Sequence, residues 1–428
     1  MIGILFISLA VLLILTVPVG VILLIISAIP SFLGSFAVDA QYIVRNVVEA
    51  FNNTTLLAIP LFILSGVIMA KGQISKKLYD IFAYFIGNLT GGLPSAVVVT
   101  CLFYGAISGS GPATTAAVGS MTIPLLVSLG YDLTFCASLV AVAGGLGVII
   151  PPSIPFVMYC NSSGVSVGDM FLAGIVPGLL IGGLLIFYTV FYCKTKGEDR
   201  EKIHKKVQEL RGIGFWGVFK DSFWALMSPV IILGGIYAGV VTPTEAACVS
   251  VVYALIVSFF IYRTMGLKDI APVLLESVTT VSSCLIITGA ASIFAKVVTL
   301  LRIPQTVAEL LGAIASNRIL LLLLINGVLL IVGMLLDTGA SVMIMTPILL
   351  PLVKAVGVSP LHFGILMIVN LAIGFVTPPV GMNLYVASSL TGIKPMDIAK
   401  KAVPLLGMFF AALMLITFVE KISTVLVS

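Results

Sequence analysis

The sequence predicts an all-α protein that crosses a membrane many times and is built from two repeats of inverted topology. Apolar residues make up 60% of the 428 residues, charged residues make up 9%, and the mean hydropathy is +1.24. This composition lies far outside that of soluble proteins, and the length leaves room for about ten crossings of ~20 residues each. In addition, Pro124 to Phe156 matches Pro351 to Asn383 at a constant offset, here called the repeat register. We therefore expect one helical unit to occur twice.

The matched segments share a helix break in the middle of an apolar stretch. Gly147 to Pro152 falls on Gly374 to Pro379, and each stretch ends in a Pro-Pro pair. Proline lacks the amide hydrogen that continues a helix, so backbone carbonyls are released at membrane depth, where only protein or a water-filled cavity can surround them. Broken helices at corresponding positions of two repeats are typical of secondary transporters.

The first repeat, residues 1–193, is expected to begin with two short spans around a turn at Pro18 and a third crossing from Asn53 to Ala70. A re-entrant helical hairpin follows at about residues 93–127, with small polar residues at its tip. A broken helix at about residues 133–160 and one more span complete the repeat.

A basic linker, residues 194–221, joins the repeats. It holds eight of the 22 Lys and Arg residues, together with five acidic residues. Such a concentration of basic residues is typical of a cytoplasmic loop of a membrane protein, and a nucleic-acid partner is not expected. Tracing the spans outward from this loop places both chain termini in the periplasm. Because the first basic residue is Arg45, the apolar N-terminus is expected to remain as a span rather than to be removed as a signal peptide.

The second repeat, residues 222–428, follows the same plan in the opposite orientation. Two spans flank a turn at Pro243, and a third crossing leads to an apolar stretch at about residues 319–353. The centre of this stretch, Asp337 to Ser341, is polar, so a hairpin that enters the membrane and returns explains it better than one long span. A broken helix at about residues 361–388 and a final span complete the repeat.

Each hairpin tip can lie beside the helix break of its own repeat. Both tips are rich in hydroxyl or carboxylate side chains, and both breaks release carbonyl oxygens. Hard oxygen ligands close to the C-terminal ends of half-helices favour Na⁺, so two repeats predict two sodium sites. Kinks that are packed for flexibility and bind no ion are the alternative.

Asp337 is the most informative single residue. A carboxylate at the centre of a hairpin costs roughly 2.5–3.5 kcal/mol on insertion scales unless it meets a cation or water. It could bind an ion, carry a proton, contact the solute or cap the following half-helix. Lys71 and Lys296 lie near span ends, where their amines are expected to extend to the membrane surface. The residues expected to line a solute site are Ser110, Thr114, Ser153, Asp337, Ser341 and Asn383.

An intramembrane enzyme is the rival class of protein. The stretch Gly105 to Gly109 contains a serine but has one residue too many for a G-x-S-G motif. Neither His204 nor His362 is expected inside a span, where it could serve as the base for such a serine. The sequence contains no nucleotide-binding fingerprint, so transport would be driven by ions or by a partner rather than by ATP bound to this chain.

Four stretches together resemble the large membrane subunit of the tripartite ATP-independent periplasmic (TRAP) transporters. The resemblance covers essentially the whole chain, and it implies an elevator-type, Na⁺-coupled importer in the lipid bilayer of the bacterial inner membrane. Such importers take up small organic acids, such as sialic acids or C4-dicarboxylates. Two partners are implied, a small four-helix membrane subunit, expected here as a separate chain, and a periplasmic substrate-binding protein. The four stretches are Ala58 to Phe62, Gly105 to Ala113, Ile149 to Pro155 and Thr377 to Asn383.

The resemblance also implies where the two sodium sites lie, between each hairpin tip and the break of the same repeat. A stand-alone dicarboxylate and sodium symporter, which needs no binding protein, remains the alternative within the class of transporters. The residues assigned to the first site are Ser108, Gly109, Ser110, Gly145, Val148 and Pro151. Those assigned to the second site are Gly333, Asp337, Thr338, Gly339, Gly374, Thr377 and Val380.

Overall fold

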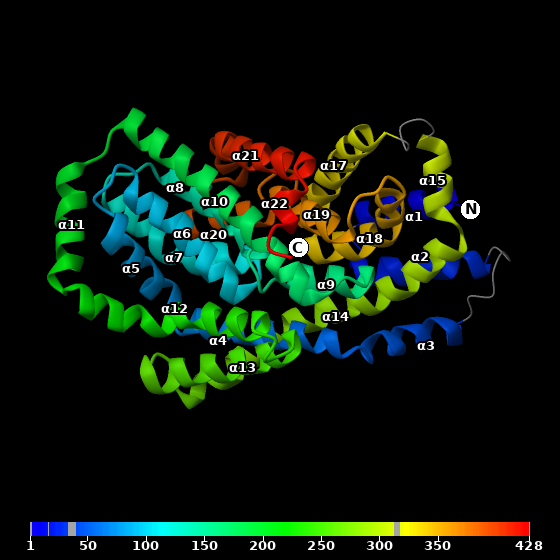
Figure 1. Ribbon diagram of the computed structural model, residues 1–428, viewed down its shortest axis with the longest axis horizontal. Coiled ribbons are helices and arrows are strands. Elements are labelled where there is room, and N and C mark those ends of the chain that lie inside the picture. The colour runs from blue at the N-terminus through cyan, green and yellow to red at the C-terminus, as the bar shows by residue number, and fades with distance from the viewer. Residues whose placement is uncertain (1, 16, 33–39, 312–316, 428) are drawn as a thin grey trace.

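The computed structural model describes residues 2–15, 17–32, 40–311 and 317–427. These residues form helices joined by short loops, as the ribbon in Figure 1 shows. Among the described helices, eight are long and apolar enough to cross a membrane. The prediction of an all-helical, polytopic membrane protein is confirmed.

The first half of the chain contains the helical hairpin and the broken helix in the expected order. The hairpin is the pair α6 and α7, and the broken helix consists of α8 and η2 before the break and α9 after it. The elements are α1 (Ile2–Ile14), α2 (Val19–Phe32), α3 (Ala40–Phe51), η1 (Thr54–Leu57), α4 (Ala58–Lys71), α5 (Ile74–Ile86), α6 (Gly92–Ser108), α7 (Gly111–Ser128), α8 (Leu133–Gly144), η2 (Gly145–Val148), α9 (Ile154–Ser163) and α10 (Val167–Lys196).

The second half repeats this order after a connecting helix. Its hairpin is the pair α17 and α18, and its broken helix consists of α19 and α20. The elements are α11 (Arg200–Gly212), α12 (Phe215–Tyr237), α13 (Pro243–Ile256), η3 (Val257–Ile261), η4 (Leu267–Asp269), α14 (Ile270–Leu300), α15 (Ile303–Leu311), α17 (Arg318–Leu335), α18 (Thr338–Ala355), α19 (Pro360–Gly374), α20 (Met382–Thr391), α21 (Pro395–Phe418) and α22 (Lys421–Thr424).

The repeat register relates the hairpins of the two halves helix by helix. Helices α7 and α18 coincide at both ends in this register, and α6 and α17 end at the equivalent residues Ser108 and Leu335. The two tips therefore match in backbone although their side chains differ. In Figure 1, α11 lies at one end of the molecule and α15 at the opposite end, and α14 runs between the two end regions.

Both broken helices are interrupted where the sequence predicts. The breaks are residues 149–153 and residues 375–381. Ser153 caps the N-terminus of α9: its hydroxyl accepts a hydrogen bond from the amide of Phe156 at 3.4 Å. Gly381 immediately precedes α20 and has a φ of 54°, a left-handed conformation that favours glycine. Each break contains one cis bond, Pro151-Pro152 in the first and Pro378-Pro379 in the second.

Three short amphipathic helices, α3, α5 and α15, were not expected from the sequence. In α5 the buried residues Ile74, Leu78 and Ile81 recur with helical spacing, while charged residues occupy the other face. Each of these helices is short and partly polar. The mean hydropathy of a window as long as a membrane span therefore does not reveal it. The 3.6-residue period is the signal that would have revealed them.

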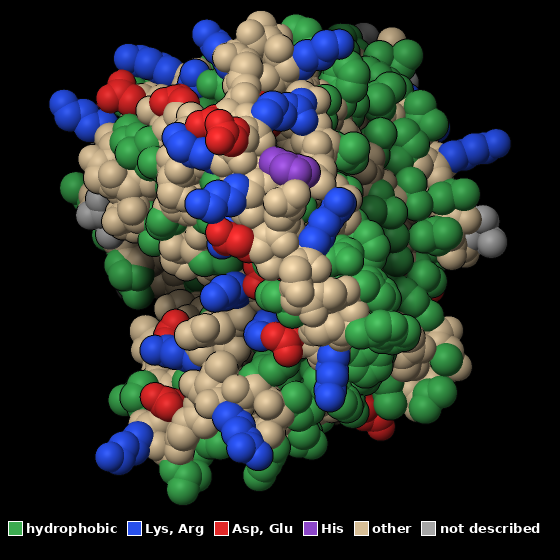
Figure 2. All heavy atoms as spheres, turned by 90° about the vertical axis from the view of Figure 1, so that its left-hand side faces the viewer, with side chains coloured by type: hydrophobic (Ala, Val, Ile, Leu, Met, Phe, Trp, Pro, Cys, Tyr) green, Lys and Arg blue, Asp and Glu red, His purple; other side chains and the backbone are tan. Residues whose placement is uncertain are grey.

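The linker at residues 194–221 contains helix α11, and the spans on both sides extend into it. Helix α10 continues to Lys196 and α12 begins at Phe215, earlier than the expected start of the second repeat. Asp199 caps α11, since its carboxylate accepts a hydrogen bond from the amide of Lys202 at 3.2 Å. Figure 2 shows the end of the molecule that carries α11, where many Lys and Arg side chains gather on one face.

Glu198 fastens the start of this linker to the first hairpin. Its side chain is 2% exposed, and its Oε1 accepts hydrogen bonds from the Tyr131 hydroxyl at 2.5 Å and the Gly91 amide at 3.0 Å. Its Oε2 lies 3.5 Å from Nη2 of Arg200. Burial and the hydrogen bond to Glu198 raise the pKa of Tyr131, so this hydroxyl remains a donor. The loops before α6 and before α8 are thereby held to the linker.

Candidate ion and solute sites

The tip of the first hairpin packs directly against the first helix break. Ser108 Oγ and Thr114 Oγ1 are 2.8 Å apart, and Thr114 Oγ1 donates a hydrogen bond to the Ser110 carbonyl oxygen at 2.8 Å. A methyl group added at Gly147 would lie 2.7 Å from that same carbonyl oxygen. The Ile154 amide donates to the Gly109 carbonyl at 3.4 Å. Backbone from the tip and backbone from the break therefore meet here, and the Thr114 hydroxyl also approaches Gly147.

The six residues assigned to the first sodium site are only partly brought together. Ser108, Gly109 and Ser110 form the tip, where Gly109 has a φ of 60°. The carbonyl of Val148 accepts a hydrogen bond from Ser153 Oγ at 2.6 Å. Gly145 packs against the second half of the chain, since a methyl group added there would lie 3.5 Å from the carbonyl oxygen of Ala372. The last assigned residue is Pro151, which is buried in the break.

The tip of the second hairpin packs against the second break through glycine. A methyl group added at Gly374 would lie 2.7 Å from the Cα atom of Gly333. The amide of Val380 donates a hydrogen bond to the Met334 carbonyl at 3.3 Å, and Thr377 Oγ1 donates to the Ile373 carbonyl at 2.8 Å. Gly374 and Gly147 are equivalent in the repeat register. The same close approach of tip and break therefore occurs in both halves.

Asp337 caps α18 and is accessible. Its Oδ2 accepts a hydrogen bond from the Gly339 amide at 2.9 Å, and its carbonyl accepts from Ser341 Oγ at 2.8 Å. Its side chain is exposed, whereas Thr338 is buried and its hydroxyl has no hydrogen-bond partner in the described structure. Carboxylate, hydroxyl and carbonyl oxygens are the donor atoms that Na⁺ and other hard cations prefer. The residues of the second site thus have suitable chemistry.

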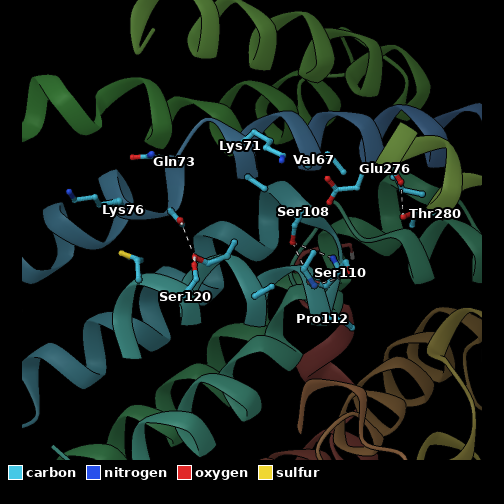
Figure 3. A pocket seen from close by; sticks show the side chains of 18 of the residues that line it. Val67, Lys71, Gln73, Lys76, Ser108, Ser110, Pro112, Ser120, Glu276 and Thr280 are labelled. Carbon is cyan, nitrogen blue, oxygen red and sulfur yellow. Dashed lines mark hydrogen bonds between the residues drawn. The ribbon is translucent and has the colours of Figure 1, made fainter. Parts of the chain in front are cut away.

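A cavity of about 790 Å³, here called cavity A, lies between α4, α7 and α14. Figure 3 shows Ser108 and Ser110 at one wall of this cavity, with Lys71 of α4 and Glu276 of α14 on other walls. The tip of the first hairpin therefore faces both the first helix break and this cavity. The remaining polar residues that line cavity A are Gln73, Ser75, Lys76, Ser120 and Thr280.

Ser110 is the one predicted solute residue that lines cavity A. Thr114 and Ser341 are fully buried and donate hydrogen bonds to the carbonyls of Ser110 and Asp337. Ser153 and Asn383 are also fully buried; the Asn383 amide donates to the Ala141 carbonyl at 2.9 Å. In this conformation, these four side chains bond to backbone carbonyls of the tips, of η2 just before the first break and of α8, and do not line cavity A.

Sequence reasoning missed several polar residues of the interior. Glu276 lies in an apolar span, and a carboxylate in such a position is a functional-site signal that could have found it. A buried network was also missed, in which Asn370 Nδ2 donates to Asn326 Oδ1 at 2.8 Å and Asn326 Nδ2 donates to Thr417 Oγ1 at 3.0 Å. In the described residues, no group of three His, Cys, Asp or Glu residues could hold a transition metal.

Comparison with known proteins identifies a family of membrane transporters. A model of the family described as "Tripartite ATP-independent periplasmic transporter, DctM component" matches residues 6–422. The chain is 41% identical over 397 residues to the isethionate TRAP transporter permease protein DctMQ of Oleidesulfovibrio alaskensis, a match that covers 93% of this chain and 62% of that protein. The chain thus spans less than two thirds of this relative's length.

Two further relatives match over most of both chains. The C4-dicarboxylate TRAP transporter large permease protein DctM of Pseudomonas aeruginosa is 40% identical over 88% of this chain and 87% of its own length. The sialic acid TRAP transporter large permease protein SiaM of Vibrio cholerae is 32% identical over 96% of this chain and 94% of its own.

A solved structure shares the fold. It is the crystal structure of the Alcanivorax borkumensis YdaH transporter, which is described as having an unusual topology; its TM-score is 0.59 at 15% identity, and the match covers 95% of this chain and 97% of that one. The resemblance that the sequence motifs indicated is confirmed by the family model and by the relatives. The chain belongs to the DctM component family of the tripartite ATP-independent periplasmic transporters, which are transporter permeases and not enzymes.

Proposed function

We propose that this chain is the large permease subunit of a Na⁺-coupled importer that moves a small organic anion across the bacterial inner membrane. The observation that carries the proposal is the repeated contact between a hairpin tip and a helix break. Gly147 meets the Ser110 carbonyl in the first half, and Gly374 meets Gly333 in the second. Hydroxyl, carbonyl and carboxylate oxygens are available at or near these two contacts, and such oxygens suit two sodium sites.

The orientation follows from charge. The face that carries α11 is rich in Lys and Arg side chains (Figure 2), so by the positive-inside rule it lies in the cytoplasm. The two repeats then have inverted topology, and the hairpins enter the membrane from opposite sides. Both termini lie in the periplasm; their end residues, Met1 and Ser428, are outside the described part of the chain. We further propose an elevator mechanism, in which the hairpins and broken helices move together relative to the remaining spans.

An acidic solute fits cavity A. Lys71 and Lys76 line the cavity and can attract an anion, and Glu276 leaves the wall charge mixed rather than uniformly positive. The names of the relatives refer to isethionate, C4-dicarboxylates and sialic acid, all of which are organic acids. A carboxylate or sulfonate is therefore the expected recognition group. Since Ser110 belongs to both the first tip and cavity A, solute and ion can be coupled there.

Two partners complete the proposal. The relative named DctMQ is longer than this chain, which supports a second, small membrane component as a partner of this chain. The family is described as a tripartite periplasmic transporter, which supports delivery of the solute by a periplasmic binding protein. A stand-alone symporter would need neither partner.

Reconstitution into proteoliposomes tests the proposal. The chain, the small subunit and the solute-loaded binding protein should together give concentrative uptake that requires an inward Na⁺ gradient. If one net positive charge enters per cycle, a membrane potential of about 100 mV, negative inside, adds ~2.3 kcal/mol to the driving force. Undiminished uptake after replacement of Na⁺ by choline would contradict the coupling, and equal uptake without the binding protein would favour the stand-alone symporter.

A further inference from the structure

A second cavity lies at the other end of α14. This cavity, here called cavity B, has a volume of about 480 Å³, is open to the surface and is lined by residues of α3, α9, α14 and α18. Figure 1 shows α3, α9 and α18 on the same side of the molecule as α15, away from α11. Its polar lining residues are Tyr42, Asn161, Ser162, Ser292, Lys296 and Thr299.

Cavities A and B are made from equivalent segments of the two repeats. In the repeat register, the part of α14 that lines cavity B falls on α4 and the turn after it, which line cavity A. Met343 falls on Ala116 in this register, and α4 and α14 are each followed by a turn whose last residue has a positive φ, Gln73 after α4 and Arg302 after α14. Because the repeats are proposed to have opposite orientation, equivalent cavities must open toward opposite sides of the membrane.

A row of polar residues, here called the polar stripe, recurs along α14 between the two cavities and winds around the helix, because every fourth residue advances about 40° past a full turn. Every fourth residue from Glu276 to Lys296 is polar or a cysteine, and the first two line cavity A while the last two line cavity B. At about 1.5 Å per residue the stripe is about 30 Å long, close to the thickness of a bilayer core. It is accessible at its ends and closed at Thr288, which is fully buried. The six residues are Glu276, Thr280, Cys284, Thr288, Ser292 and Lys296.

The charge of cavity B suits an anion. Among the described residues that line it, only Lys296 is charged. Lys296 contacts Asn46 Oδ1, and its amine lies 3.5 Å from Glu49 Oε2. The Lys296 and Glu49 side chains are 47% and 63% exposed, and an ion pair in water is weak, so another carboxylate can replace that of Glu49.

An amide donor lies on the facing wall. Asn161 Oδ1 accepts a hydrogen bond from Asn53 Nδ2 at 2.6 Å, which leaves the Asn161 amide nitrogen as a donor with no partner in the described structure. A cation on α14 and an amide on α9 can together bind the oxygens of one carboxylate or sulfonate group. The hydroxyls of Ser162 and Ser292 lie in the same lining.

We propose that cavity B is an outer anion site, at which Lys296 and Asn161 hold the acid group of the solute on the side of the membrane opposite to cavity A. This inference rests on the proposed function, because it assigns the solute of that same transporter to a second position. Thr288, which lies on α14 between the two cavities, is fully buried, so the solute advances from B to A only when the moving unit changes position.

Side-specific labelling tests the site. Ser292→Cys, in a background without the native cysteines, should react with a membrane-impermeant thiol reagent from the periplasmic side. Thr280→Cys, the matched control in cavity A, should react from the cytoplasmic side. Isethionate or succinate should slow the reaction of the Ser292→Cys protein severalfold, whereas uncharged ethylene glycol should not. Labelling of Ser292→Cys only from the cytoplasm, or no protection by either acid, would overturn the proposal.

Substitution of Lys296 tests whether its charge holds the anion. Lys296→Gln should remove the protection and raise the concentration of loaded binding protein needed for half-maximal uptake by about tenfold, with the Na⁺ dependence unchanged. Lys296→Arg should retain both properties, which shows that a loss in the Gln variant is not a folding defect. Protection that is equal in wild type and Lys296→Gln would overturn the role of Lys296. Failure of Na⁺-dependent uptake by the wild type would instead refute the proposed function, while the labelling result would still decide whether cavity B binds anions.

Discussion

Ser110 and Asp337 hold equivalent positions in the two hairpins, and each caps the second helix of its hairpin. Ser110 Oγ accepts a hydrogen bond from the Ala113 amide at 3.5 Å, and Asp337 Oδ2 accepts one from the Gly339 amide at 2.9 Å. The cap requires an acceptor oxygen but not a charge, since serine supplies it in the first repeat. The role proposed here for the negative charge of Asp337 is to bind a cation.

Replacement of Asp337 by Asn tests this assignment. Asn retains size and an acceptor oxygen, so the cap of α18 should remain and the purified protein should keep its thermal unfolding midpoint within a few degrees. Concentrative uptake in proteoliposomes should be lost, because a charge-assisted contact with Na⁺ disappears.

Asp337→Ser is the matched control, since it installs the residue found at the equivalent position of the first tip. It should show the same loss of uptake and the same retained fold. Wild-type uptake with unchanged Na⁺ dependence in both variants would show that Asp337 serves only as a cap.

Ser108→Ala and Thr377→Ala probe the two proposed sodium sites separately. Each removes one hydroxyl, and loss of a neutral ligand worth about 1 kcal/mol should raise the Na⁺ concentration for half-maximal uptake roughly fivefold. Thr122→Ala and Thr346→Ala are controls away from the breaks. Their hydroxyls are fully buried and donate to the preceding turn, at 2.7 Å to the Val118 carbonyl and 2.6 Å to the Val342 carbonyl. An equal shift in the controls would assign the effect to packing.

Gly147→Ala and Gly374→Ala should each separate a tip from its break. The added methyl group would lie 2.7 Å from the Ser110 carbonyl in the first case and 2.7 Å from Gly333 Cα in the second, so backbone must move. Overpacking of this kind costs about 1–3 kcal/mol, and the thermal midpoint in detergent should fall with uptake. Gly183→Ala and Gly327→Ala meet no atom within 4 Å and should leave both unchanged. Normal uptake by Gly147→Ala would argue against close contact of tip and break during transport.

Glu198→Ala should loosen the linker from the first hairpin. It leaves the Tyr131 hydroxyl and the Gly91 amide without their acceptor, so we expect a loss of about 1–3 kcal/mol in the free energy of unfolding. Glu198→Gln keeps an acceptor oxygen and should lose less. Glu201→Ala, on the exposed side of α11, is the control that should be neutral. A thermal midpoint that is identical in all three variants would show that the Glu198 contacts do not contribute to stability.

The sequence by itself determined the class of protein, the two hairpins and the two helix breaks. These are local properties: a run of apolar residues must lie in a membrane or a core, and Gly147 to Pro152 cannot continue a helix wherever it lies. The motifs also sufficed to indicate the family. The amphipathic helices were within reach of the sequence through their periodicity, as the spacing of Ile74, Leu78 and Ile81 shows.

Only the tertiary structure decided which polar residues share a site. Ser110 and Glu276 lie far apart in the chain, yet both line cavity A. Lys296 and Asn161 are likewise far apart in the chain, and both line cavity B. Conversely, Ser153 and Asn383, which the sequence predicts to line a solute site, are buried and bonded to backbone carbonyls. A hydroxyl or amide has the same chemistry on either side of a helix. Whether it faces a cavity or a neighbouring backbone depends on how the helices pack, and no local pattern in the chain encodes that.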